Sequence, residues 1–279
     1  MSLADKINTK KKYRKKVSFI TLIDTYLKHR KKFNPFKAEI KRNDIIGFHP
    51  SGLYNACPRQ IAFQFIEEKD LYKKTITTEF SHYETNPDME MTWDFGHLIH
   101  FLIQYGYLLD YDKAAKVEQP ITSLYNKYLI SGTADVIVNL QDNKKYLGDI
   151  KTIRSEQFYR LESKYDVSEA YRTQLSLYMF GLKIPRGFIC FINKNDSRKK
   201  EFFYTIEKDL LKKALQTTLH AKKFLKGGDT PILDECKKKK GKYKYCAYSS
   251  LCFQCKSGND ILRYVKMKNN FDIIKLKRA

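Results

Sequence analysis

Short segments rich in β-branched and aromatic residues recur through the middle of the chain, and they constrain its fold more than any other feature. Before a predicted helix at 168–182 they indicate strands at 117–122, 128–131, 135–140 and 146–152, and after it strands at 187–193 and 199–206. Short polar turns separate the first strands, which we expect to be mostly antiparallel. This order of elements predicts an α/β fold with one central mixed sheet.

Helical patterns flank the predicted sheet. One lies at 94–109, and a long basic helix at 207–225 ends before the paired glycines Gly227 and Gly228. The length of 279 residues fits one large domain with appendages. We therefore expect a basic arm at 1–16, a single domain at 17–260 with its core at 94–206, and a basic tail at 261–279.

The charge of the chain predicts a polyanionic partner. Lys and Arg number 53 against 31 Asp and Glu, which gives a formal net charge of +22. Nucleic acid is the first partner that such a charge indicates, an anionic membrane surface is the second, and a solvated Lys-rich surface is the alternative. No apolar run approaches the roughly 20 residues that span a bilayer, and the N-terminus lacks the apolar region of a secretory signal. We expect a cytoplasmic protein without a membrane partner, from a prokaryotic cell or encoded by a phage.

Two acidic motifs at predicted strands indicate a metal site. Asp135 follows Gly132 in the pattern G-x-x-D, and Asp149 precedes Lys151 in D-x-K. Residues two apart on a strand face the same side, so Asp149 and Lys151 should project together. Carboxylate oxygens suit Mg²⁺ or Mn²⁺, and a lysine beside them can position water or offset charge on a phosphate. This chemistry is hydrolysis of a phosphate ester, although D-x-K alone also occurs by chance on exposed strand ends.

Side chains from two predicted helices support the same site. His100, in Gly96-x-x-x-His100, offers a nitrogen ligand suited to Mn²⁺, with His97 as its competitor. Gln174 and Tyr178 are four residues apart on a helix and therefore share one face. They are able to contact a phosphate or hold Lys151, and ordinary packing is the alternative.

In this order and spacing, the motifs G-x-x-x-H, G-x-x-D, D-x-K and Q-x-x-x-Y resemble the RecB-like branch of the PD-(D/E)XK nucleases over about residues 45–255. The resemblance implies a restriction-endonuclease-like core in which Lys151 is the catalytic lysine and Gln174 and Tyr178 form an accessory motif. It assigns the Mg²⁺ or Mn²⁺ to His100, Asp135, Asp149 and the carbonyl of Ile150. Glu118, on the strand before Asp135, is a possible outer ligand.

The function that this resemblance implies is hydrolysis of DNA phosphodiester bonds. We expect the protein to act as an exonuclease. The expected substrate is DNA that is single-stranded or has single-stranded ends, bound without sequence specificity. The setting would be recombination, repair, CRISPR adaptation or DNA processing by a phage or mobile element, with a helicase, recombinase or integrase as a possible partner. One alternative is a catalytically weak DNA-binding subunit of the same fold, and another is an unrelated zinc-stabilised nucleic-acid binder.

Cysteine placement predicts a second metal centre. Cys57 lies far upstream, Cys236, Cys246, Cys252 and Cys255 cluster near the end, and Cys190 lies in an apolar strand and reads as core. Four thiolates are able to hold an iron–sulfur cluster or a structural Zn²⁺.

A subset of RecB-like nucleases, including CRISPR-associated adaptation exonucleases and AddB-type nuclease domains, carries one Cys before the nuclease motifs and three after them, around a [4Fe–4S] cluster. This chain is similar: Cys57 matches the upstream ligand, and Cys246 and Cys252 match the last two. The usual C-x2-C pair is absent here. The resemblance leaves Cys236 to complete the set, with Cys255 as the alternative and Zn²⁺ as the alternative cofactor.

Overall fold

A computed structural model describes residues 18–23, 45–68, 95–109, 115–238, 246, 248–255, 257–261 and 263. The predicted basic arm at 1–16 and most of the predicted tail at 261–279 lie outside the described residues.

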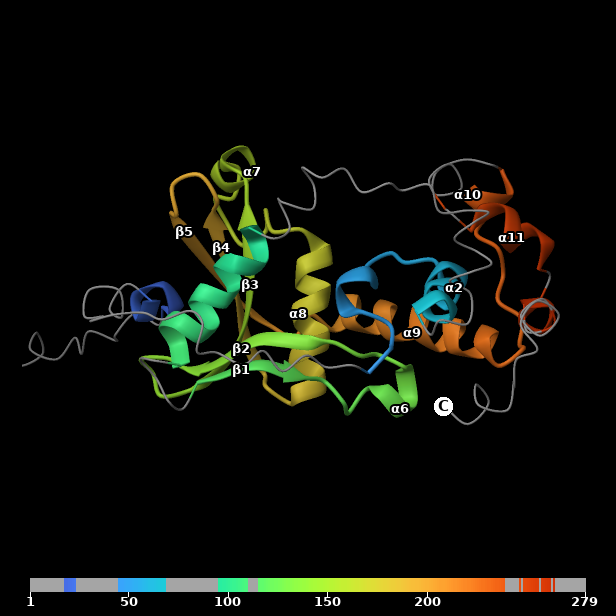
Figure 1. The fold of residues 1–279 in the computed structure, drawn as a ribbon, viewed down its shortest axis with the longest axis horizontal. Helices are drawn as coiled ribbons and strands as arrows, with labels where there is room; N and C mark the ends of the chain where they lie inside the picture. The colour runs from blue at the N-terminus through green and yellow to red at the C-terminus, as the bar shows by residue number, and fades with distance from the viewer. Residues whose placement is uncertain are drawn as a thin grey trace, which may run out of the picture.

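The centre of the molecule is a five-stranded mixed sheet with the strand order β1-β2-β3-β4-β5 (Figure 1). Its only parallel pair joins β3 to β4, and each remaining pair is antiparallel. The sheet confirms the predicted α/β class with mixed strand directions. The strands are β1 (Lys116–Pro120), β2 (Thr133–Asn139), β3 (Lys145–Ile153), β4 (Arg186–Asn193) and β5 (Lys199–Thr205).

Helices cover both faces of the sheet, because its buried side chains alternate between two apolar clusters. On one face, Leu147 and Ile189 pack with Met179 of helix α8 (Glu169–Leu182). On the other, Val138 and Phe188 pack with residues of the helix that spans 95–109, whose second half is the π-helical turn η4 (Leu102–Leu108), and with the short helix at 19–23. The sheet is therefore the middle layer of three.

The crossover between the parallel strands places helix α8 beside the sheet. The chain leaves β3 through the short helix α7 (Ser155–Tyr159), and the Ser168 hydroxyl caps α8 by accepting the Ala170 N–H. Helix α8 ends where Lys183 adopts a left-handed conformation, with φ 56°. Long-range pairing of β3 with β4 needs a connection of this length, because parallel strands cannot be joined by a tight turn.

A helical layer lies beyond α8. Helix α9 (Lys208–Leu225) packs against α8 and α2 (Pro58–Glu68), as Figure 1 shows. Near α2 lie the short helices α10 (Asp234–Lys237) and α11 (Ser249–Gln254), so this early helix lies beside segments that follow α9. Two further short elements are the turn η3 (Pro50–Gly52) and helix α6 (Tyr125–Tyr128). In the described ranges, none of the helices combines the length and apolar character needed to cross a membrane.

The strand predicted at 128–131 is wrong. Helix α6 extends to Tyr128, and Leu129 then turns the chain with φ 55°. After this turn, Ile130 forms one isolated parallel bridge with Phe48 and does not become part of a strand. The apolar sequence there is nevertheless buried, with Ile130 0% exposed. Burial of this segment, without strand pairing, accounts for its β-like composition.

Candidate active site

Strands β2 and β3 bring the two predicted acidic motifs together. The backbone N–H of Ile150 donates to the Asp135 Oδ2 carboxylate oxygen at 2.7 Å, which joins the G-x-x-D motif on β2 to the D-x-K motif on β3. Close strand packing permits this contact: a Cβ on Gly148 would stand 2.2 Å from the Phe188 ring. Gly148 therefore allows β3 to approach its neighbours just before Asp149.

Asp149 and Lys151 form a buried ion pair on the same side of β3, as predicted from their spacing. The Lys151 Nζ lies 2.8 Å from Asp149 Oδ2 and donates a hydrogen bond to Asp149 Oδ1 at 3.0 Å. Asp149 is fully buried, and the Lys151 ammonium also lies 5.3 Å from the centre of the Tyr171 ring. A second D-x-K, Asp142-x-Lys144, sits on the exposed β2–β3 turn with a looser 3.5 Å contact. Of these two D-x-K motifs, Asp149-x-Lys151 is the one that lies buried beside another carboxylate.

His100 reaches the same carboxylates from the helix at 95–109. Its Nδ1 lies 3.6 Å from Asp135 Oδ2, and its side chain is 25% exposed. His97, the competing histidine, is exposed on the same helix. Of the two histidines, the structure therefore brings His100 to the carboxylates.

Burial shifts the acid–base behaviour of the site. It raises the pKa of Asp135 and that of Asp149 to about 6 each, even though the Lys151 charge lowers both. Burial alone would lower the pKa of Lys151, but the Asp149 and Asp135 charges outweigh it and raise that pKa. Burial lowers the pKa of His100 to about 4, so its ring is neutral at pH 7. One lysine, paired with Asp149, offsets the charge of two neighbouring carboxylates, which leaves the site short of positive charge.

The accessory residues lie on the buried side of α8. The Gln174 amide donates to the Tyr178 hydroxyl at 3.2 Å, and both side chains are buried. Burial and then the charge on Asp149 raise the pKa of Tyr178, so this phenol stays protonated beside the carboxylates. The predicted pairing of amide and phenol is present, at the edge of the carboxylate site.

Gln104 is a site residue that the sequence did not indicate. Its amide donates to Glu118 Oε1 at 2.8 Å and to the backbone oxygen of Asp135 at 3.0 Å, and the side chain is buried. It lies in the π-helical turn η4, a rare local geometry often found at functional sites. Glu118 itself has φ 49°, an unfavourable conformation for a residue with a side chain. Gln104 thus holds a strained acidic residue against Asp135.

The donor types of this site suit a hard divalent cation. Imidazole and carboxylate groups are ligands for Mn²⁺ and Mg²⁺. Within the described residues, however, no group of three His, Cys, Asp or Glu side chains is already arranged to hold a metal ion. The Lys151 ammonium lies against the Asp149 carboxylate, so cation binding there would require that contact to shift.

The structure gathers the predicted cysteine set around one small cavity. Cys57 at the start of α2, Cys236 in α10, and Cys246 and Cys252 near α11 line a space of about 20 Å³. Burial raises the pKa of Cys246 and of Cys252. A volume near 20 Å³ holds about one water-sized body, so a [4Fe–4S] cluster would require the cavity to widen more than Zn²⁺ would.

Cys255 and Cys190 have other surroundings. Cys255 is 3% exposed and does not line that cavity, while Cys190 is fully buried in the sheet. Burial raises the pKa of Cys255 to about 11, the same direction as for Cys246 and Cys252. Of the two alternatives for the remaining position, the geometry favours Cys236.

Arg59 joins α2 to the segment after α9 and to α11, beside the cysteines, and sequence reasoning gave it no role. Its guanidinium donates to the backbone oxygens of Thr230 at 2.6 Å, Cys252 at 3.0 Å and Cys255 at 2.7 Å. It also lies 4.7 Å from the centre of the Phe224 ring, and the residue is 3% exposed. This buried charge closes a loop of 193 residues between Arg59 and Cys252.

Comparisons with known proteins add little to this geometry. No protein-family model matches the chain, and no curated protein matches it. Among solved structures, the crystal structure of SSO0001 is similar, with 21% identity over 84% of this chain and 96% of that chain, at a TM-score of 0.40. A similarity this distant carries no information about function.

Proposed function

We propose that the protein is a metal-dependent DNA nuclease of the PD-(D/E)XK type. The observation that carries this proposal is the convergence of Asp135, Asp149 and Lys151 from adjacent strands, with Ile150 N–H bonded to Asp135 Oδ2 and His100 Nδ1 3.6 Å from the same oxygen. This is the arrangement that the ordered sequence motifs predict for such enzymes. The surplus of 22 positive charges supports a nucleic-acid substrate.

In this proposal, Asp135, Asp149 and His100 hold Mg²⁺ or Mn²⁺, with the Ile150 carbonyl and Glu118 as further oxygen donors. The bound cation would lower the pKa of a water molecule and offset negative charge on the phosphate. Lys151 releases Asp149 and donates to the attacking water or to a phosphate oxygen. Gln104 keeps Glu118 in place, and Gln174 with Tyr178 lines the substrate side as hydrogen-bond donors.

The cavity lined by Cys57, Cys236, Cys246 and Cys252 supports a structural cofactor in the same proposal. Either a [4Fe–4S] cluster or Zn²⁺ would bond residues from both ends of the chain. Such a bond closes a very long loop and therefore stabilises the folded protein. The cofactor has no part in the cleavage step, because its ligands lie on the α2 and α11 side of the molecule.

One observation favours a second candidate, a DNA-binding subunit of the same fold with weak catalysis. The Lys151 ammonium is ion-paired with the Asp149 carboxylate. Among the described residues, no three metal-ligating side chains lie close enough together to hold a cation. In this candidate, the buried charges stabilise the fold and the basic surface binds DNA.

One experiment separates the two candidates. Purified protein is incubated with end-labelled single- and double-stranded DNA, linear and circular, in Mg²⁺ or Mn²⁺. A nuclease releases labelled product only in the presence of the cation, and an exonuclease leaves circular DNA intact. A protein that binds the linear DNA but releases no product under any of these conditions is the binding subunit.

A further inference from the structure

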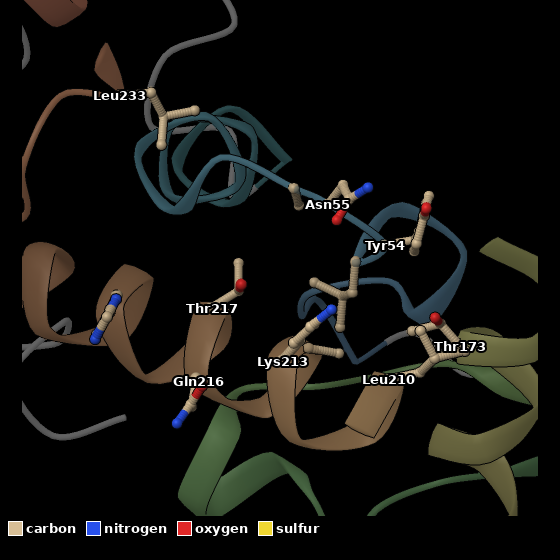
Figure 2. Close-up of a pocket in the computed structure, with 12 residues that line it drawn as sticks. Tyr54, Asn55, Thr173, Leu210, Lys213, Gln216, Thr217 and Leu233 are labelled. Carbon is tan, nitrogen blue, oxygen red and sulfur yellow. The ribbon is translucent and has the colours of Figure 1, made fainter. Parts of the chain in front are cut away.

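A cleft of about 590 Å³ separates the segment 53–56 from one face of α9, and none of its lining residues belongs to the carboxylate site. The volume lies in the range of small-ligand sites. Figure 2 shows Lys213 and Thr217 reaching from α9 toward the segment that carries Tyr54 and Asn55.

The α9 wall of the cleft is polar and carries no acid. Lys213, Thr217 and His220 are spaced four and three residues apart, so they share one helix face. None of these side chains forms a hydrogen bond or ion pair within the described part of the chain. The residues that line the cleft include no Asp or Glu. A lysine without a countercharge, flanked by a hydroxyl and an imidazole, suits a phosphate group.

The opposite wall carries a fixed aromatic ring. The Tyr54 hydroxyl donates to Glu169 Oε2 at 2.7 Å, which ties this ring to the first turn of α8. An aromatic ring and a lysine that line one cleft are a combination that binds nucleotides of single strands, because a ring stacks on a base and a lysine contacts the phosphate. At the α8 end, Thr173 is 1% exposed, and in the described structure its hydroxyl has no hydrogen-bond partner.

We propose that this cleft is a nucleotide-binding subsite, in which a base stacks on Tyr54 and its phosphate binds Lys213. The proposal rests on the proposed function only in expecting a nucleic-acid ligand. Helix α8 links the two sites: Gln174 and Tyr178 line the carboxylate side, and the preceding Thr173 lines the cleft. A strand held in the cleft therefore extends along α8 toward the carboxylates.

Binding of fluorescent oligothymidylates of 2 to 20 nucleotides, measured by anisotropy without added divalent cation, tests the proposal. We expect Lys213→Ala to weaken binding by about fivefold or more, and Lys212→Ala, an exposed neighbour that does not line the cleft, to weaken it by less than about twofold. Tyr54→Ala should also weaken binding by at least about fivefold, whereas Tyr54→Phe keeps the ring and should bind like the unmodified protein. Circular dichroism melts confirm that each variant is folded.

Competition by thymidine 5′-monophosphate identifies the source of the ligand. Displacement of the oligonucleotide by the mononucleotide shows that the cleft recognises a free nucleotide, while retention shows that it recognises a unit of a longer strand. Equal losses for Lys213→Ala and Lys212→Ala, or for Tyr54→Ala and Tyr54→Phe, would overturn the proposal. Because no cleavage is measured, a protein that binds in this way but cuts no DNA contradicts the proposed function and leaves this inference standing.

Discussion

The backbone N–H of Ile150 donates to Asp135 Oδ2 at 2.7 Å, so the carboxylate of one sequence motif is held by the backbone of the other. This bond crosses between β2 and β3 and sets the position of Asp135. The sheet thus fixes the position of the Asp135 carboxylate, and the surrounding side chains set its acid–base behaviour.

Replacement of Gln104 will lower cleavage without unfolding the protein. Gln104→Leu removes the donor that holds Glu118 Oε1 at 2.8 Å and so frees the strained Glu118. Groups that orient metal ligands typically account for about 10- to 100-fold in activity, and we expect a kcat loss in that range. Gln119→Leu is the control, because Gln119 bonds only the nearby Val117 backbone oxygen at 2.9 Å. Equal kcat values for the two variants would show that Gln104 has no positioning role.

Cation binding will depend on pH. Burial raises the pKa of Asp135 and of Asp149 to about 6 each, so both carboxyls are ionised at pH 7.5 and largely protonated at pH 5. Protons compete with the cation, and the rise in Tm caused by 5 mM Mn²⁺ should therefore appear at pH 7.5 and vanish at pH 5. Differential scanning fluorimetry measures it, with Asp149→Asn as the variant that should show no rise at either pH.

Without a cation, the two carboxyl groups should have the opposite effect: they should stabilise the folded protein more at low pH than at neutral pH. A carboxyl whose pKa is raised in the folded state binds a proton more tightly there than in the unfolded chain, so the two groups add stability as the pH falls from about 6 to about 4. His100, whose pKa is lowered to about 4, subtracts stability as the pH falls below about 6.5. A cation-induced rise in Tm that is the same at both pH values would contradict the assignment of the carboxylates as ligands.

Loss of a cavity cysteine should remove the structural cofactor that we propose. Cys57→Ala should abolish most of the bound iron or zinc, measured by elemental analysis, and a stability loss of about 3 kcal/mol would lower Tm by about 6–10 °C. Cys255→Ala, whose thiol lies outside the cavity, should retain the metal. Metal retained in Cys57→Ala, or lost equally in both variants, would refute the ligand set.

Arg59 will prove a major stabilising residue. Arg59→Met keeps much of the apolar stem but removes the donors to Thr230, Cys252 and Cys255, and buried hydrogen bonds to charged groups are worth about 1.5–3 kcal/mol each. We expect the free energy of unfolding in urea to fall by about 3 kcal/mol or more. Arg160→Met, at an exposed ion pair with Glu156, should cost less than about 1 kcal/mol. A similar small cost at Arg59 would contradict its role as the tie between α2 and the segments that hold Thr230, Cys252 and Cys255.

The sequence predicts the parts of this molecule that follow a repeating pattern. Short runs rich in β-branched and aromatic residues identify β3 and β4, and the two-residue period of a strand places Asp149 and Lys151 together. Gln104 escapes prediction because one glutamine in a helical pattern carries no signal, and a π-helical turn has none either.

Contacts between distant segments are equally invisible in the sequence. Arg59 reads only as the start of a helix, although its partners lie 171 to 196 residues away. The segment around Ile130 is predicted as a strand because its apolar sequence is the same as that of a buried strand. In the structure it forms only a single bridge, with Phe48. The grouping of Cys236 with Cys57 followed from a family resemblance, because a long, irregular spacing does not determine which thiols meet.

The measurement that tests the central claim most directly is cleavage of end-labelled linear single-stranded DNA in Mn²⁺ by two matched pairs of variants. Asp149→Asn and Lys151→Met alter the buried pair, and Asp142→Asn and Lys144→Met alter the exposed D-x-K on the β2–β3 turn. We predict that both changes to the buried pair lower the cleavage rate by at least about 1000-fold while DNA binding persists, and that the exposed pair changes it by less than about twofold. Cleavage by Asp149→Asn at the rate of the unmodified protein would contradict the account.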